Sequence, residues 1–225
     1  MHEGAWIARE GVGPPPRAEH QPFLNAPWPV LALVGAMLAA YALQSLSGRS
    51  DAAIDAFGFS PASLTQGRWS GLVTALFLHG GWAHVGLNAL AALAFGVPVA
   101  RLFGKDVRGV LAFFAFYLAC GAISSLGYAG LHWGAPSVLV GASGAVSGLM
   151  GAASRLIERR PGLAPLASPT VVGMAAAWIV VNGLIALSGF SVGAGGVPVA
   201  WEAHLVGYAA GLLTVWPIAR ALRRI

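Results

Sequence analysis

Residues 140–152 read VGASGAVSGLMGA, and they open a block of apolar residues over 142–157. Five further apolar blocks occupy 28–47, 83–101, 108–131, 170–189 and 202–220. These five reach the length of about 20 residues that a helix needs to cross a bilayer. The chain is 57% hydrophobic and 9% charged, whereas soluble proteins average about 25% charged residues. The pattern predicts an all-α membrane protein, a bundle of six transmembrane helices, and it excludes an ordinary water-soluble domain.

The lysines and arginines predict how the chain is oriented, because they favour the cytoplasmic side of a membrane. If the six blocks cross in alternation, one side carries only Arg49 and Arg68. The other side carries the remaining basic residues: Arg9, Arg17, Arg101, Lys105, Arg108, Arg155, Arg159, Arg160, Arg220, Arg223 and Arg224. We therefore expect both termini in the cytoplasm. The net charge of +5 is explained by this topology and does not indicate a nucleic-acid partner.

The chain divides into a polar cytoplasmic tail over 1–26 and one membrane-embedded domain over 27–225. Within the domain, 48–82 form a long outer first loop with apolar residues of its own, so we expect it to pack as a small element on the membrane. The short chain without a recognisable transit sequence suggests a multi-pass protein of a bacterial inner membrane.

Polar residues stand at the outer ends of three of the predicted spans, where lipid makes them expensive. The second span opens with His84 and Asn88, which share one helix face because they are four residues apart. The fourth opens with Ser143 and the sixth with His204. All three spans run inward, and at 1.5 Å per residue these side chains lie within about 10 Å of the outer start. The topology thus predicts that they share one membrane depth.

The fourth block is too short to cross the hydrocarbon core, since about 16 residues of helix measure roughly 24 Å and the core about 30 Å. Charged residues hold its inner end, so its outer start is expected below the membrane surface. Backbone at that depth must be buried in protein or face water. We therefore expect Ser143 at a helix N-terminus, on the floor of a hydrated cavity that opens to the outer side.

Glycines indicate which helices touch. Gly207 and Gly211 form a G-x-x-x-G ridge on the sixth span, while Gly144 and Gly148 line the fourth. Small residues allow helix backbones to approach closely in lipid. Close packing of these two spans would bring Ser143 and His204 together.

The stretches FLHGGWAHVGLN at 77–88, VGASGAVSGLMGA at 140–152 and AHLVGYAAG at 203–211 together resemble the rhomboid family of intramembrane serine proteases. The likeness covers about residues 70–220, and the three motifs stand in the family's order on alternate spans. The resemblance implies a six-helix bundle that cuts single-span transmembrane proteins near the outer face, at small residues in a segment of weakened helix.

The resemblance also implies the roles of the site residues. Ser143 is the nucleophile and His204 the general base. His84, Asn88 and the backbone N–H of Ser143 stabilise the oxyanion. Rhomboids commonly carry an aromatic residue four positions after the nucleophile, where it packs on the catalytic histidine; Ser147 stands there in this chain, and Tyr208 is a candidate replacement.

The remaining polar residues favour structural roles. Glu202 is two residues from His204 and so does not share its helix face, which predicts a dyad without an acidic third member. His79 is expected to tie the first loop to the second span, and His132 to lie at the membrane interface. Cys120 is expected in packing, and Asn182 in a helix–helix contact.

Alternatives remain open at this point. Ser143 and His204 could be packing residues, in which case the chain would be a non-catalytic binder of transmembrane helices. A small transporter is disfavoured because the spans lack acidic residues apart from Glu202 at an edge. No metal or cofactor is expected, since the chain has one cysteine and no H-E-x-x-H motif. The oligomeric state stays open.

Overall fold

The computed structural model describes residues 25–158, 162–189, 191 and 199–225. Most of the predicted tail over 1–26 therefore lies outside the described residues. The described part is helical, and in it we find a single β-bridge, Phe59 with Leu139, and no strand. The helices in chain order are α1 (Trp28–Leu46), α2 (Ser50–Phe57), α3 (Pro61–Thr65), α4 (Gly71–Thr74), the 3₁₀ helix η1 (Ala75–Phe77), α5 (Trp82–Phe103), α6 (Val107–Leu131), α7 (Ser143–Ser154), α8 (Pro169–Ser188) and α9 (Trp201–Ala221).

Each of the six apolar blocks corresponds to one of the main helices, so the predicted all-α membrane bundle is confirmed. In the described part, α1, α5, α6 and α8 are long and apolar enough to cross a membrane. Helix α7 has 12 residues, about 18 Å of helix, so it is shorter still than the apolar block of about 16 residues that predicts it. The count of six complete crossings stays a prediction.

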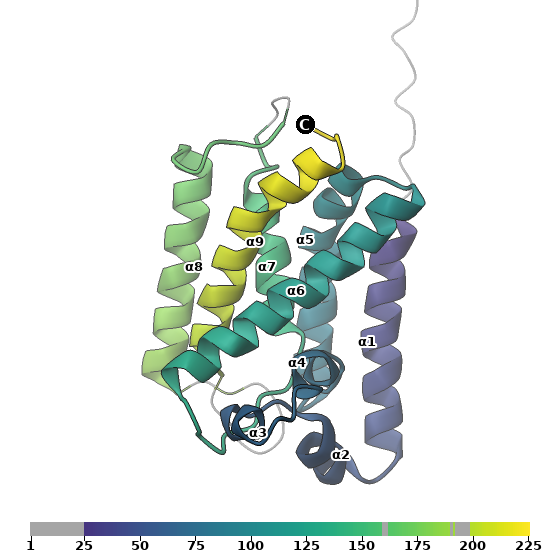
Figure 1. The fold of residues 1–225 in the computed structure, drawn as a ribbon, viewed down its shortest axis with the longest axis vertical. Helices are drawn as coiled ribbons and strands as arrows, with labels where there is room; N and C mark the ends of the chain where they lie inside the picture. The colour runs from purple at the N-terminus through teal and green to yellow at the C-terminus, as the bar shows by residue number, and fades with distance from the viewer. Residues whose placement is uncertain (1–24, 159–161, 190, 192–198) are drawn as a thin grey trace, which may run out of the picture.

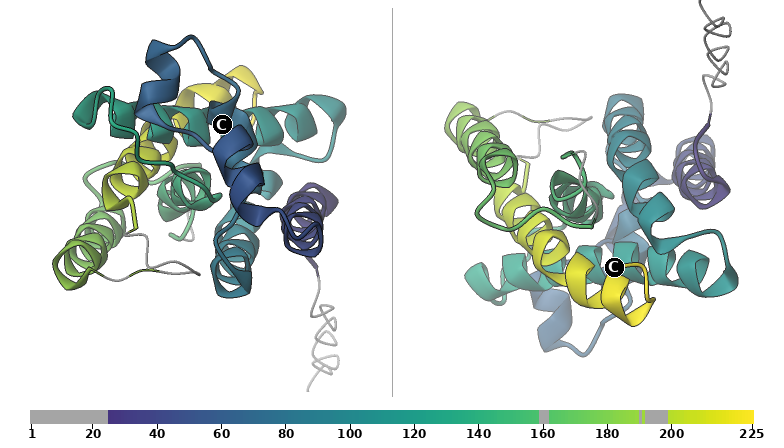
Figure 2. Two further views of the ribbon diagram at one scale, coloured as in Figure 1. Left: turned by 90° about the horizontal axis from the view of Figure 1, so that it is seen from below. Right: turned by 90° about the horizontal axis from the view of Figure 1, so that it is seen from above.

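The six main helices form a bundle with α7 in the middle. Figure 1 shows α1 and α8 at opposite sides, and α1 begins at the end of the bundle where α9 finishes. The end views in Figure 2 place α7 between α5 on one side and α8 and α9 on the other, with α6 across a third side. Every residue of α7 from Gly144 to Ser154 is buried. A helix of mostly Gly, Ala and Ser is thin enough to be surrounded in this way.

Helices α7 and α9 pack backbone against backbone. A Cβ atom added to Gly207 would collide with the carbonyl group of Gly144, and one added to Gly211 would collide with that of Gly148. Cys120 of α6 fills the space on the other side of Gly148, which fits its predicted packing role. This is the close approach that the glycine spacing predicts, and it sets α9 alongside α7.

The first loop folds into α2, α3, α4 and η1 at the end of the bundle opposite to the end of α9 (Figure 1). Within this loop, Phe59 and Leu64 are buried, whereas Phe57 and Trp69 remain exposed. The Gln44 side chain of α1 fixes the end of this loop, because its Nε2 donates to the carbonyl of His79 at 2.9 Å and its Oε1 accepts from the His79 N–H at 3.1 Å.

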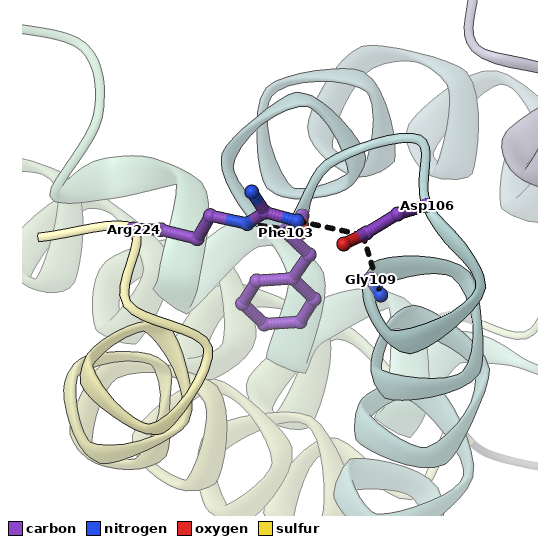
Figure 3. Close-up of polar contacts among 4 residues, drawn as sticks. All are labelled: Phe103, Asp106, Gly109 and Arg224. Carbon is purple, nitrogen blue, oxygen red and sulfur yellow. Dashed lines mark hydrogen bonds and ion pairs between the residues drawn. The ribbon is translucent and has the colours of Figure 1, made fainter.

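The C-terminal segment is clamped to the turn between α5 and α6 (Figure 3). Arg224 donates from Nε to the carbonyl of Phe103 at 2.9 Å and from Nη2 to Asp106 Oδ1 at 2.6 Å. The same carboxylate oxygen accepts from the Gly109 N–H at 3.0 Å and so caps the start of α6. This contact connects residues that are 118 positions apart.

Candidate active site

Ser143 is the first residue of α7, and its hydroxyl points at the imidazole of α9. Ser143 Oγ and His204 Nε2 lie 2.9 Å apart, which is hydrogen-bond distance, as the sequence predicts. His204 is 8% exposed and stands in the first turn of α9. Because Gly207 follows His204 by one turn and rests on Gly144, the helix packing itself delivers the imidazole to the serine.

The two side chains open into a cavity of about 840 Å³. Ser143, His204, His84 and Asn88 all line it. The backbone N–H groups at the start of a helix have no partner within that helix, so the N–H of Ser143 is available to a bound group. The structure thus gathers all four predicted side chains around one space.

Asn88 and His84 approach the chain just before Ser143. A Cβ on Gly141 would stand 2.7 Å from His84 Nε2 and 3.7 Å from Asn88 Nδ2. The φ angle of Gly141 is +114°, which L side chains rarely adopt. Both reasons make Gly141 a required glycine of the site, although the sequence analysis does not single it out.

The hydrogen bonds of His84 and Asn88 indicate which of their side-chain N–H groups are free to donate into the cavity. His84 Nδ1 accepts from the Gly80 N–H at 3.4 Å, so in the neutral ring the proton sits on Nε2, the atom nearer Gly141. Asn88 Nδ2 is buried and has no hydrogen-bond partner among the described residues. Unsatisfied buried donors are rare and call for an explanation. A developing negative charge in the cavity would supply the missing acceptor.

His79 is structural, as expected. Its ring is fully buried and meets His84 edge to face, with 5.0 Å between ring centroids. Burial, with His84 nearby, lowers the pKa of His79 from 6.5 to about 3, so the ring stays neutral. The His79 ring therefore packs against His84 on the side away from the cavity lining.

The side of His204 away from Ser143 is occupied by α8. His204 Nδ1 lies 2.9 Å from Asn182 Oδ1, and Trp178 places its ring 6.0 Å from the imidazole, centroid to centroid. Asn182 is therefore the helix–helix polar contact that the sequence indicates, but its partner is the imidazole of the site. The sequence offers no signal for that partner beyond a lone amide in an apolar span.

Two further expectations concern the surroundings of His204. Glu202 does not contact His204; its Oε1 lies 3.1 Å from Nε2 of His132, which also stacks on Tyr128. Ser147 donates to the carbonyl of Ser143 at 2.7 Å. Among the described ring contacts, the aromatic neighbour of His204 is Trp178 and not Tyr208, so Tyr208 is not the replacement.

A metal site is not formed by the described residues, where no group of three or more His, Cys, Asp or Glu side chains converges. What the cavity offers instead is a hydroxyl next to a hydrogen-bond acceptor, with several N–H donors a few ångströms away. That combination is what acyl transfer needs: a nucleophile, a base and a site for the oxyanion.

Comparison with known proteins gives two matches. The family model described as the rhomboid domain matches residues 66–221, more than half of the chain. The protein named Rhomboid protease GluP from Bacillus subtilis (strain 168) is 38% identical over 98 residues. That alignment covers 43% of this chain and 18% of the Bacillus protein, so this chain spans only a small part of its relative.

Proposed function

This chain belongs to the rhomboid family of intramembrane proteases, and from that premise we propose that it is a serine endopeptidase that cleaves transmembrane segments of other proteins. The observation that carries the proposal is the 2.9 Å contact between Ser143 Oγ and His204 Nε2. Asn88 Nδ2, which has no hydrogen-bond partner among the described residues, lies beside the same cavity and supports it.

The chemistry follows from the positions of the atoms. His204 Nε2 takes the proton of Ser143 as Oγ attacks the carbonyl carbon of the scissile peptide. The carbonyl oxygen becomes an oxyanion that accepts hydrogen bonds from Asn88 Nδ2, His84 Nε2 and the Ser143 N–H. His204 then returns the proton to the leaving amine. Water repeats the same sequence on the acyl-enzyme and restores the serine.

The substrate class and the location are part of the proposal. We place the chain in a bacterial inner membrane with both termini cytoplasmic and the cavity open to the outer side, in agreement with the distribution of arginines. Its partners are single-span membrane proteins and the surrounding lipid. Segments of weakened helix fit best, because a peptide bond inside a regular helix is not accessible to Oγ.

The test compares cleavage of a tagged single-span substrate in liposomes by wild type, Ser143→Ala and His204→Ala. Wild type is expected to cut, and both variants to fall below detection. Ser70→Ala, which removes the hydroxyl of an exposed residue that does not line the cavity, is the matched control and should keep full activity. A fluorophosphonate probe should label wild type and fail to label either site variant.

Equal cleavage by wild type and Ser143→Ala would contradict the proposal. In that case the chain would be a binder of transmembrane helices without proteolytic activity.

A further inference from the structure

Helix α8 carries one buried polar side chain on an otherwise apolar surface. Within α8 only Val171 and Asn182 are buried, and Asn182 is 0% exposed. Its neighbours Ile179, Val180 and Val181 are exposed, as expected for residues that face lipid. A buried amide within a membrane span destabilises the fold unless it is hydrogen-bonded. The two hydrogen bonds of the Asn182 side chain therefore indicate its role.

The first bond fixes the direction of the amide. Asn182 Nδ2 donates to the carbonyl of Trp178 at 2.9 Å. A backbone carbonyl only accepts, so the atom that faces it has to be the NH₂ group. The oxygen Oδ1 is thereby turned toward α9, where it lies 2.9 Å from His204 Nδ1.

The second bond fixes the proton of the imidazole. Because Oδ1 only accepts, His204 Nδ1 has to carry the hydrogen. In a neutral ring this leaves the lone pair on Nε2, which faces Ser143 Oγ at 2.9 Å. The chain of bonds from the Trp178 carbonyl to the Ser143 hydroxyl is consistent in only this direction.

We propose that Asn182 is a positioning residue of the protease: it holds His204 as the tautomer, and in the orientation, that can take the proton of Ser143. The inference rests on the proposed function. Glu202, the acidic residue nearest to His204 in the sequence, is paired with His132 instead. The orienting role is therefore filled by a neutral amide from a different helix.

The experiment uses two substitutions of Asn182: one is expected to be the more stable variant, and the other is expected to be the more active one. Asn182→Leu removes the acceptor, keeps the branching of the side chain and suits an apolar helix. Asn182→Asp keeps the acceptor but brings a carboxylate into the membrane, which costs stability. A structural role predicts that Leu is tolerated better than Asp, whereas a positioning role predicts that Asp is the more active variant. Val181→Leu, on the exposed face, is the control.

We expect Asn182→Leu to lower kcat roughly 10- to 100-fold, a part of the roughly 10²–10⁴ that a positioned base contributes, with KM unchanged. Asn182→Asp should keep most of the activity of wild type at a lower thermal midpoint in detergent. Full activity of Asn182→Leu would overturn the inference, and so would losses in both variants that merely follow the fall in stability.

Nitrogen-15 spectra of histidine-labelled protein test the same claim without catalysis, with His204 assigned by its absence in His204→Ala. We expect a proton on Nδ1 in wild type and a mixture of tautomers in Asn182→Leu. If wild type cleaves no better than Ser143→Ala while Nδ1 carries the proton, the proposed function fails and the hydrogen-bond assignment stands. A proton on Nε2 in wild type overturns the inference about Asn182.

Discussion

Asn88 is the residue whose environment points most directly to chemistry. Its Nδ2 is buried without a partner among the described residues, beside a glycine whose hydrogen is the only substituent that fits under the His84 ring. An unsatisfied buried amide destabilises a fold by about 1–3 kcal/mol, and Asn88, unlike the buried ring of His79, borders the cavity that holds Ser143 and His204. The arrangement makes sense if the amide meets its acceptor only during the reaction.

Asn88→Ala is therefore expected to lower kcat about 10²–10³-fold, which corresponds to the loss of one oxyanion donor, about 2.7–4 kcal/mol of transition-state stabilisation. The fold should be no less stable, because a buried group without a partner is removed. Steady-state cleavage assays and thermal unfolding in detergent measure the two effects. A drop in stability with unchanged kcat would show that Asn88 is structural.

Among the helices, the pair α7 and α9 carries the most demanding packing. Gly207 and Gly211 leave no room for side chains between the two backbones, while Gly144 and Gly148 make room for Ser124 and Cys120 of α6 on the other side of α7. The register of this contact sets the distance between Ser143 and His204, because each stands at the start of its own helix. The distance between Ser143 and His204 thus depends on Gly207 and Gly211, which follow His204 by one and two turns of α9.

Gly211→Ala should push α9 away from α7, since the new Cβ meets the Gly148 carbonyl group. We expect a loss of about 1–3 kcal/mol in stability, as for other overpacked sites, together with a fall in kcat from the longer Ser143–His204 distance. Gly173→Ala is the matched control: on α8, its Cβ would meet nothing within 4 Å. Similar unfolding midpoints and activities for the two variants would contradict the packing argument.

Taken as a whole, the bundle is closed at the end where α9 finishes. There, the carboxylate of Asp106 connects the start of α6 to the C-terminal segment, because it accepts from the Gly109 N–H and from the Arg224 guanidinium (Figure 3). Those contacts hold the pKa of Asp106 below its ordinary 3.8, the Gly109 N–H contributing most. The ionised form is therefore the stabilising one, above the pKa of the unfolded state. The contribution is lost as the pH falls through the folded pKa.

Asp106→Asn isolates this charge, because asparagine still caps a helix. At neutral pH wild type should unfold at a slightly higher temperature than the variant, the effect being small for an exposed pair. The difference should shrink from about pH 4 downward, as the carboxylate of wild type becomes protonated. Thermal unfolding in detergent at pH 7 and pH 3 measures it. A difference that stays the same at both pH values would exclude the ion pair as its source.

The amino-acid sequence by itself determined the class of fold and the helices that carry the site. Apolar blocks of bilayer length have few alternatives to helices, because lipid offers no partners for backbone groups. Ser143, His84, Asn88 and His204 stand out because polar residues are scarce in such blocks. The glycines predicted which two helices touch, since only small residues permit that approach.

Only the tertiary structure decided what surrounds His204. A hydrogen bond between Asn182 and an imidazole 22 residues away depends on how α8 rotates about its axis, and a helix that is apolar on every side has no polar stripe from which that rotation could be predicted. The same holds for Trp178, which takes the place beside the imidazole considered for Tyr208, and for Gly141, whose need for glycine comes from the position of the His84 ring. Spacing along one helix is a local property, whereas contacts between helices are set by the packing of the whole bundle.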